Sequence, residues 1–201
     1  MPKVTLEYRE LVRTRILESA HRIFSQKGYR EATMDEIAEG LGLSKAALYR
    51  YFQSKEELFR EILELYTQAT AKALRESFKN SRFDPEIFFP LIDKWGWTPN
   101  LFFSAASEAP RNRKLRKIFA DGYRTAVAMV ETFIEELKNR GILNDGANSR
   151  LIAMGAIAIY DGLLIGEVAG LSKQETRNAF VDSIQAMFSG LLVSTKETKL
   201  R

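Results

Sequence analysis

The residues best suited to a chemical task lie in one short stretch, residues 33–55, which reads TMDEIAEGLGLSKAALYRYFQSK. On a helical wheel beginning after Ser44, one arc holds Ala46, Ala47, Tyr49 and Arg50, flanked by Lys45 and Tyr51. Alanines allow close approach to DNA bases, a lysine can hydrogen-bond guanine edges, and tyrosine hydroxyls can reach phosphates. This pattern predicts a short helix that enters the major groove of DNA.

Two capped helices and a tight turn are predicted to position this arc. Thr33 and Glu36 form a capping box, and apolar residues then recur at helical spacing up to Leu41. Gly42 suits the left-handed residue that ends a helix, and Ser44 can cap the next one. A third cap, Ser54 with Glu57, follows at once. An ordinary amphipathic hairpin with a solvated face is the alternative interpretation.

The stretch resembles the DNA-binding domain of the TetR (tetracycline repressor) family. The resemblance runs from about Arg13 to Leu63 and rests on ILESAHRIFSQKGY, ATMDEIAEGLGLSKAALYRYF and SKEELF. It implies an all-α chain with an N-terminal three-helix domain, residues 1–54, whose helix-turn-helix spans about 33–52. Residues 55–201 would then form an effector-binding and dimerisation domain, with residues 54–78 as the linking helix.

We assign roles at the predicted DNA surface as follows. Lys45 is the candidate for a base contact, with Ala46 and Ala47 giving close approach. The candidates for phosphate or sugar contacts are Thr33, Ser44, Tyr49, Tyr51 and Lys55, and the role of Lys55 is implied by the family resemblance. Residues 1–55 carry ten Lys or Arg against seven Asp or Glu, so most of the net charge of +4 lies there.

Composition argues against several other classes of function. The chain has 201 residues, 45% hydrophobic and 28% charged, as expected for a soluble globular protein. It has no cysteine and a single histidine, His21, so we expect no metal site, no cofactor and no enzyme activity. No signal sequence is evident, and the longest charge-free apolar run, residues 151–160, is too short to cross a bilayer. We therefore expect a cytoplasmic protein that does not bind membranes.

The first helix is predicted from about Tyr8 to Lys27, ended by Gly28. Arg13 and Arg15 lie near its start. Their side chains either contact DNA phosphates or are simply solvated, and the sequence leaves both alternatives open. Helix 54–78 would connect the DNA-binding domain to the rest of the chain.

Residues 83–103 are rich in aromatic residues and prolines, which predicts two or three short helices. Simple core packing is one interpretation of the rings, and the wall of an apolar effector cavity is the other. We name as candidate walls Phe88, Phe89, Trp95, Trp97, Phe102, Phe103, Phe119 and Tyr123.

A long helix is predicted over residues 110–140, opened by Pro110, with five basic residues near its start. A solvated surface is the default interpretation of this run. Alternatively, Arg111, Arg113 and Lys117 would hold an anionic head group, which together with the apolar wall points to a fatty acyl-CoA effector.

Two further helices are predicted at residues 149–169 and 173–194. The first is apolar almost all round and rich in Ala and Gly, so it must be buried on most sides. The family resemblance implies a homodimer through this pair, whereas closing the core of a single chain is the alternative.

The function implied is a ligand-responsive transcriptional regulator, a repressor released from a palindromic operator by a hydrophobic effector. Two alternatives remain open at this point: a helical-bundle carrier or enzyme with an apolar pocket, and a DNA-binding regulator that has lost its effector.

Overall fold

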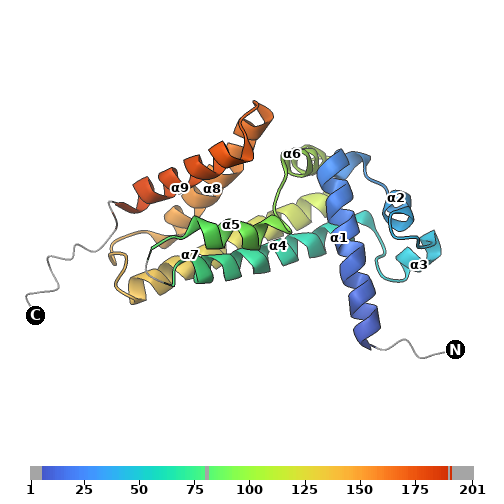
Figure 1. The fold of residues 1–201 in the computed structure, drawn as a ribbon, viewed down its shortest axis with the longest axis horizontal. Helices are drawn as coiled ribbons and strands as arrows, with labels where there is room; N and C mark the ends of the chain where they lie inside the picture. The colour runs from blue at the N-terminus through green and yellow to red at the C-terminus, as the bar shows by residue number, and fades with distance from the viewer. Residues whose placement is uncertain (1–5, 80–81, 190, 192–201) are drawn as a thin grey trace, which may run out of the picture. The chain divides into compact units, whose positions relative to one another are not determined.

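The computed structural model describes residues 6–79, 82–189 and 191, and these residues form nine helices (Figure 1). The predicted all-α fold is confirmed. The helices are α1 (Leu6–Glu31), α2 (Met34–Glu39), α3 (Lys45–Tyr49), α4 (Lys55–Ser77), α5 (Pro85–Asp93), α6 (Pro99–Glu108), α7 (Arg113–Asn139), α8 (Ser149–Val168) and α9 (Lys173–Ser189).

The predicted caps of α2 and α3 are both present. The Thr33 hydroxyl accepts a hydrogen bond from the Glu36 N–H, and the Glu36 carboxylate accepts one from the Thr33 N–H. Gly42 has φ +64°, the left-handed conformation expected in the turn. The Ser44 hydroxyl then accepts from the Ala47 N–H at 3.1 Å, which starts α3. The turn chemistry therefore fixes where the short α3 begins.

Helix α1 differs from its predicted end. Gly28 leaves helical geometry, with φ +82°, but a final turn resumes and α1 ends at Glu31. A Cβ at Gly28 would lie 2.8 Å from the hydroxyl oxygen of Ser104 on α6. The glycine thus serves both the kink and the close approach of α6, which packs against α1.

The long helix α7 begins later than predicted. Pro110 lies in the turn after α6, and α7 starts at Arg113 because Asn112 supplies the cap. The Asn112 side-chain oxygen accepts hydrogen bonds from the N–H groups of Lys114 and Leu115, each at 3.0 Å. An asparagine cap outweighed the preference of proline for a first helical turn.

Packing divides the chain into two compact units, while the predicted DNA-binding and effector-binding domains remain a prediction. The N-terminal unit contains residues 1–66 and 95–122, and the second unit contains residues 67–94 and 123–201. Residues 95–122, which belong to the predicted second domain, pack within the same unit as the helix-turn-helix. Helices α4 and α7 each contribute residues to both units.

In the second unit α8 and α9 run side by side (Figure 1). Their contacts include the edge-to-face pair of Tyr160 and Phe180, with ring centres 5.7 Å apart. Helix α9 is described only to Ser189, so residues 190 and 192–194 of the predicted helix lie outside the described residues.

Candidate nucleic-acid interface

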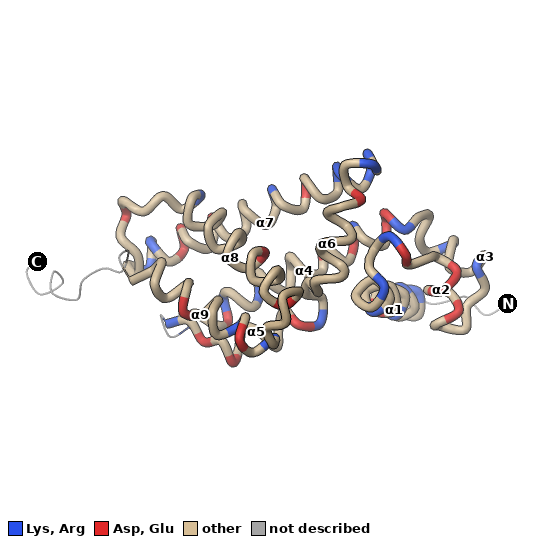
Figure 2. The backbone as a smooth tube through the Cα atoms, turned by 90° about the horizontal axis from the view of Figure 1, so that it is seen from above, with Lys and Arg blue, Asp and Glu red and all other residues tan. Residues whose placement is uncertain are grey.

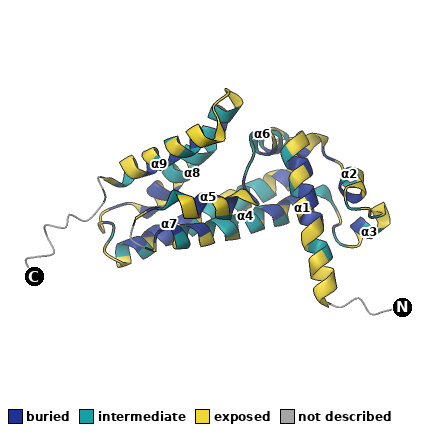
Figure 3. Cartoon of the chain, in the orientation of Figure 1, coloured by how far each residue is buried: buried dark blue, intermediate teal, exposed yellow. Residues whose placement is uncertain are grey.

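Helix α3 presents a polar, cationic face to solvent and one apolar side chain to the core. Lys45, Ala46 and Tyr49 are exposed, whereas Leu48 is fully buried (Figure 3). Ala47 is partly exposed beside them, and Ser44 and Thr33, at the caps, are exposed too. Because α3 has five residues and buries one of them, Leu48, most of its surface remains free for a partner. The structure therefore brings together the residues predicted to approach the bases.

Lys45 is held by a carboxylate of the same motif. Its ammonium lies 2.8 Å from Asp35 on α2, and this hydrogen-bonded pairing raises the pKa of Lys45. Both side chains remain more than half exposed, at 61% and 55%. Water screens an ion pair this exposed, so its lysine can be released to a DNA base at small cost.

Lys55 has a different place from the predicted phosphate contact. Its ammonium donates to the carbonyl oxygens of Tyr29, Arg30 and Ala32, at 2.8, 3.0 and 2.9 Å. A lysine has three N–H donors, and all three are used. Burial lowers the pKa of Lys55, and the positive charge complements the carbonyl groups at the end of α1. The structure thus makes Lys55 the cap of α1.

The predicted effector residues fall into two clusters of rings. In the N-terminal unit, Trp97, Phe102 and Phe119 contact one another and Phe103 contacts Phe102, and all four are half-buried. In the second unit, Phe88 and Phe89 are buried against Phe83 and Phe180. Tyr123 is 42% exposed, and Trp95 is buried beside His21. The eight predicted wall residues are therefore divided between the two units, with Trp95, Trp97, Phe102, Phe103 and Phe119 in the first and Phe88, Phe89 and Tyr123 in the second.

Phe59 and Tyr66 of α4, which are not among the predicted effector residues, extend the cluster of the N-terminal unit. We call the rings of Phe59, Tyr66, Trp97, Phe102, Phe103 and Phe119 the N-terminal ring cluster. Phe59 on α4 stacks on Phe119 and contacts Trp97. Phe59 also meets Tyr29 of α1 edge to face, with ring centres 5.2 Å apart. Tyr66 contacts Trp97 as well. Only the helical spacing of Phe59 indicated an inward position. Half-buried rings are thus joined by direct contacts to the end of α1 that Lys55 caps.

The basic run lies at the surface. Arg111 donates to the carbonyl oxygen of Ser107, and Lys117 pairs with Asp121 at 2.6 Å. Arg113 is exposed at the first position of α7. Figure 2 shows how Lys and Arg are distributed along the chain, including this run and α3. Among the described residues, no group of three or more His, Cys, Asp and Glu is arranged to hold a metal ion.

Comparison with known proteins identifies the N-terminal segment. Residues 16–62 match the family model of bacterial regulatory proteins of the tetR family. The chain is 43% identical over 63 residues to an uncharacterized helix-turn-helix transcriptional regulator, YfiR, of Bacillus subtilis. This match spans 31% of each of the two chains.

Longer matches extend the likeness beyond the DNA-binding segment. The helix-turn-helix transcriptional regulator UidR of Escherichia coli K12 is 24% identical over 187 residues, covering 91% of this chain and 94% of UidR. A regulator from Saccharomonospora viridis, solved in complex with choline, has the same fold, with a TM-score of 0.64. It is 20% identical and covers 92% of this chain and 99% of its own. The capped helix-turn-helix, the all-α fold and these relatives together establish that the chain belongs to the TetR family of helix-turn-helix transcriptional regulators and is not an enzyme.

Proposed function

We propose that the chain is a ligand-responsive repressor that binds a palindromic operator as a homodimer in the cytoplasm. The observation that carries the proposal is the exposed face of α3, with Lys45, Ala46 and Tyr49 on a helix anchored only by Leu48. In this proposal Lys45 reads a guanine edge, while the hydroxyls of Thr33, Ser44, Tyr49 and Tyr51 contact the backbone. A two-fold dimer would place two such helices in successive major grooves, roughly 34–36 Å apart.

The proposed dimer surface is an apolar stripe on α8, which we call the α8 stripe. It is made of exposed residues at helical spacing: Leu151, Met154, Ala158, Gly162 and Ile165. Leu151 and Ile165 are 65% and 60% exposed. Large exposed apolar patches mark sites of association, and small residues such as Ala158 and Gly162 allow two helices to approach closely. A second copy of α8 is therefore our proposed cover.

A membrane is the other surface that could cover this helix. By length and composition alone α8 could cross a bilayer, and only 17% of its most apolar window is buried in the chain. Its charge-free part, residues 151–160, is by itself too short to span a bilayer. The relatives of this chain are DNA-binding regulators, and α8 carries Arg150, Asp161 and Glu167. Both observations favour a second subunit.

The proposed effector is hydrophobic and binds at the N-terminal ring cluster. Trp97, Phe102 and Phe119 are only half-buried, so apolar area remains for a ligand to cover, at about 25 cal/mol per Å². The exposed Arg113 belongs to the same unit and could hold an anionic head group, as could Lys117 after leaving Asp121. A long-chain acyl-CoA combines the two features and is the class we favour.

The proposed mechanism of release follows the ring contacts. A ligand that displaces Trp97 or Phe119 also displaces Phe59, which packs on Tyr29 beside the cap of α1. The two states need only differ in their affinity for the effector, because that difference is what shifts the population between them. Movement of α4 would then change the separation of the two α3 helices in a dimer.

The test is a parallel titration of the protein–operator complex with palmitoyl-CoA, palmitate and a neutral aromatic compound, using a duplex obtained by in vitro selection. Release by palmitoyl-CoA, weakened by Arg113→Ala with Lys117→Ala, supports the acyl-CoA proposal. Release by the neutral compound alone, unaffected by these substitutions, refutes it. Because both tryptophans of the chain, Trp95 and Trp97, lie in the N-terminal unit, their fluorescence reports ligand binding independently of DNA.

A further inference from the structure

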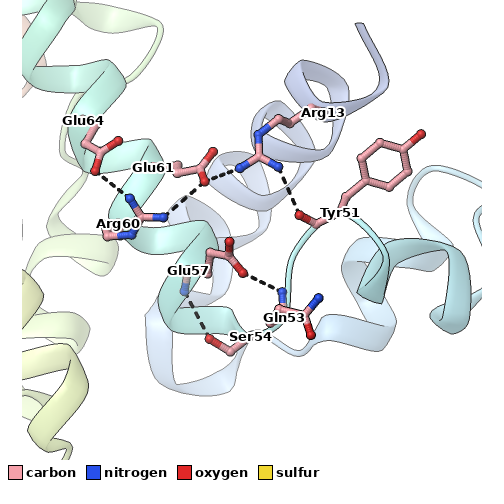
Figure 4. Close-up of polar contacts among 8 residues, drawn as sticks. All are labelled: Arg13, Tyr51, Gln53, Ser54, Glu57, Arg60, Glu61 and Glu64. Carbon is pink, nitrogen blue, oxygen red and sulfur yellow. Dashed lines mark hydrogen bonds and ion pairs between the residues drawn. The ribbon is translucent and has the colours of Figure 1, made fainter. Parts of the chain in front are cut away.

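Arg13 of α1 joins three parts of the N-terminal unit. One guanidinium nitrogen donates to the carbonyl oxygen of Tyr51 at 3.1 Å, and another pairs with the carboxylate of Glu61 on α4 (Figure 4). The guanidinium carbon also lies 4.3 Å from the centre of the Phe52 ring. Tyr51 follows the end of α3 almost directly, so a single side chain connects α1, the exit of α3 and α4.

The environment of this contact makes it stronger than an ordinary surface pair. Phe52 is fully buried, and the side chains of Arg13 and Glu61 are 30% and 14% exposed. By contrast, Arg60, which also pairs with Glu61 at 3.4 Å, and its second partner Glu64 are 46% and 55% exposed. Charges that are partly removed from water interact more strongly and are screened less by salt.

The turn between α3 and α4 is fixed at a second point. The Glu57 carboxylate accepts a hydrogen bond from the Gln53 N–H at 2.6 Å, and the Ser54 hydroxyl caps the Glu57 N–H (Figure 4). Glu57 thus binds the residue before Ser54 instead of completing a box with it. With Arg13 on Tyr51 and Glu57 on Gln53, both sides of Phe52 are held.

We propose that Arg13 is a positioning residue for DNA recognition: it fixes the exit of α3 against α4, and it contributes to DNA affinity without contacting a phosphate. The proposal rests on DNA binding through α3. A positively charged residue near the start of α1 invites the phosphate interpretation. The structure instead directs one N–H of each terminal guanidinium nitrogen to Tyr51 or Glu61 and packs the guanidinium against the Phe52 ring.

Glu61 supplies a test in which the two interpretations predict opposite signs. If electrostatics alone mattered, removing a carboxylate from the DNA-binding unit would strengthen binding to a polyanion. If Glu61 matters because it anchors Arg13, Glu61→Gln weakens DNA binding. Glu64→Gln is the matched control, since it removes the same charge from the same helix at an exposed position that pairs with Arg60 at 2.8 Å.

The experiment measures affinity for a duplex that the wild-type chain selects from a random library, across several salt concentrations. All variants are compared at a temperature where circular dichroism shows them fully folded, so a loss of stability alone does not register. We expect Arg13→Ala and Glu61→Gln each to lower affinity about tenfold, and the double variant to be little worse than either single one. The salt dependence should match wild type, and Glu64→Gln should bind at least as tightly as wild type.

The role of Arg13 is overturned if Glu61→Gln binds as tightly as wild type, or if the two losses simply add. A fall of about 0.9 in the salt slope with Arg13→Ala would assign it to phosphate and also refute the proposal. If the wild-type chain selects no duplex at all, DNA binding itself fails and the role of Arg13 with it. That outcome is separate from a failure of Arg13 alone.

Discussion

The exposed surfaces of α3 and α8 are opposite in kind. Helix α3 has five residues, buries Leu48 and exposes a lysine, an alanine and a tyrosine, all suited to a polar partner. Helix α8 has twenty residues and exposes the apolar side chains of Leu151, Met154, Ile165 and Val168, whose contact with water is unfavourable. Its few charged residues contrast with the frequent charges on α1 and α4 (Figure 2).

We infer from this difference that the α3 face can form in a single chain, whereas the α8 stripe is covered only when a second chain packs on it. The face of α3 is positioned by contacts within the N-terminal unit, including the Thr33, Ser44 and Ser54 caps and the Arg13 contacts. The α8 stripe needs a partner to remove apolar area from water. In the proposed dimer, DNA recognition would depend on both surfaces, because an operator with two half-sites would bind two α3 helices only if α8 held the copies together.

The largest effect is expected from breaking the α8 stripe. A Cβ at Gly162 would meet no atom within 4 Å in the single chain, so Gly162→Arg should leave the fold intact and place a charge at the proposed interface. We expect a monomer by light scattering and an operator affinity lower by about 100-fold, through loss of the second half-site. Gln68→Arg, at an exposed position on α4, outside the predicted dimer pair, is the control and should remain dimeric. A dimeric Gly162→Arg protein would refute the α8 interface.

Phe188 is a poor site for the same test, although its helix belongs to the predicted dimer pair. Phe188 is half-buried, and its ring centre lies 6.5 Å from that of the buried Phe78 in the second unit. A charge there would destabilise the chain itself, so the loss of dimer would be uninformative.

Lys45→Ala tests the α3 side of the comparison. If Lys45 reads a base, discrimination between the selected operator and a duplex of altered half-sites should fall by about 1–3 kcal/mol, or about tenfold or more. Competition binding with single-base-pair variants would locate the position that is read. Equal losses on every duplex would instead assign Lys45 to the phosphate backbone.

Lys55→Met tests whether the cap of α1 supports the α3 surface. Three carbonyl groups lose their donor, and we expect the free energy of unfolding to fall by about 1–3 kcal/mol in urea titrations. The salt slope of DNA binding should not change, whereas a phosphate contact would lower it by about 0.9. Lys27→Met, which removes an exposed pair with Glu36, is the control and should change the free energy of unfolding little.

The smallest effect concerns Asp161 of α8, beside the stripe. Burial raises the pKa of Asp161 from 3.8 to about 6, so the folded chain binds this proton more tightly than the unfolded chain. The protonated carboxyl of Asp161 therefore favours the folded state relative to the ionised carboxylate. This contribution is fully present below about pH 4 and is lost as the pH rises through about 6. Asp161→Asn should therefore stabilise the protein by about 1–2 kcal/mol at about pH 8 and little at about pH 4. Urea titrations at both pH values check this, and an equal effect at the two would contradict it.

Local signals accounted for the parts of the structure that depend on near neighbours in sequence. The Thr33–Glu36 box, the turn at Gly42 and the Ser44 cap each involve residues within a few positions of one another, so the helix-turn-helix followed from the sequence. The linking helix, predicted over 54–78 and found at Lys55–Ser77, has an uninterrupted apolar stripe between a cap and a polar break.

The remaining features depend on residues far apart in sequence. Lys55 binds carbonyl groups 23 to 26 positions away, and Arg13 binds partners 38 and 48 positions away. A basic residue near a DNA-binding motif resembles a phosphate ligand until its donors are located. The aromatic run also gave no indication that Phe88 and Phe102 belong to different units, because ring content does not encode which neighbours each ring meets.

The most direct test of the whole account is in vitro selection of DNA from a random duplex library by the purified chain. We predict a palindrome whose half-site centres are separated by about one helical turn or a multiple of it, bound by two chains. Lys45→Ala should relax the selected sequence, and Gly162→Arg should abolish the selection. Recovery of no preferred sequence, or of a single unpaired half-site selected equally well by Gly162→Arg, would contradict the central claim.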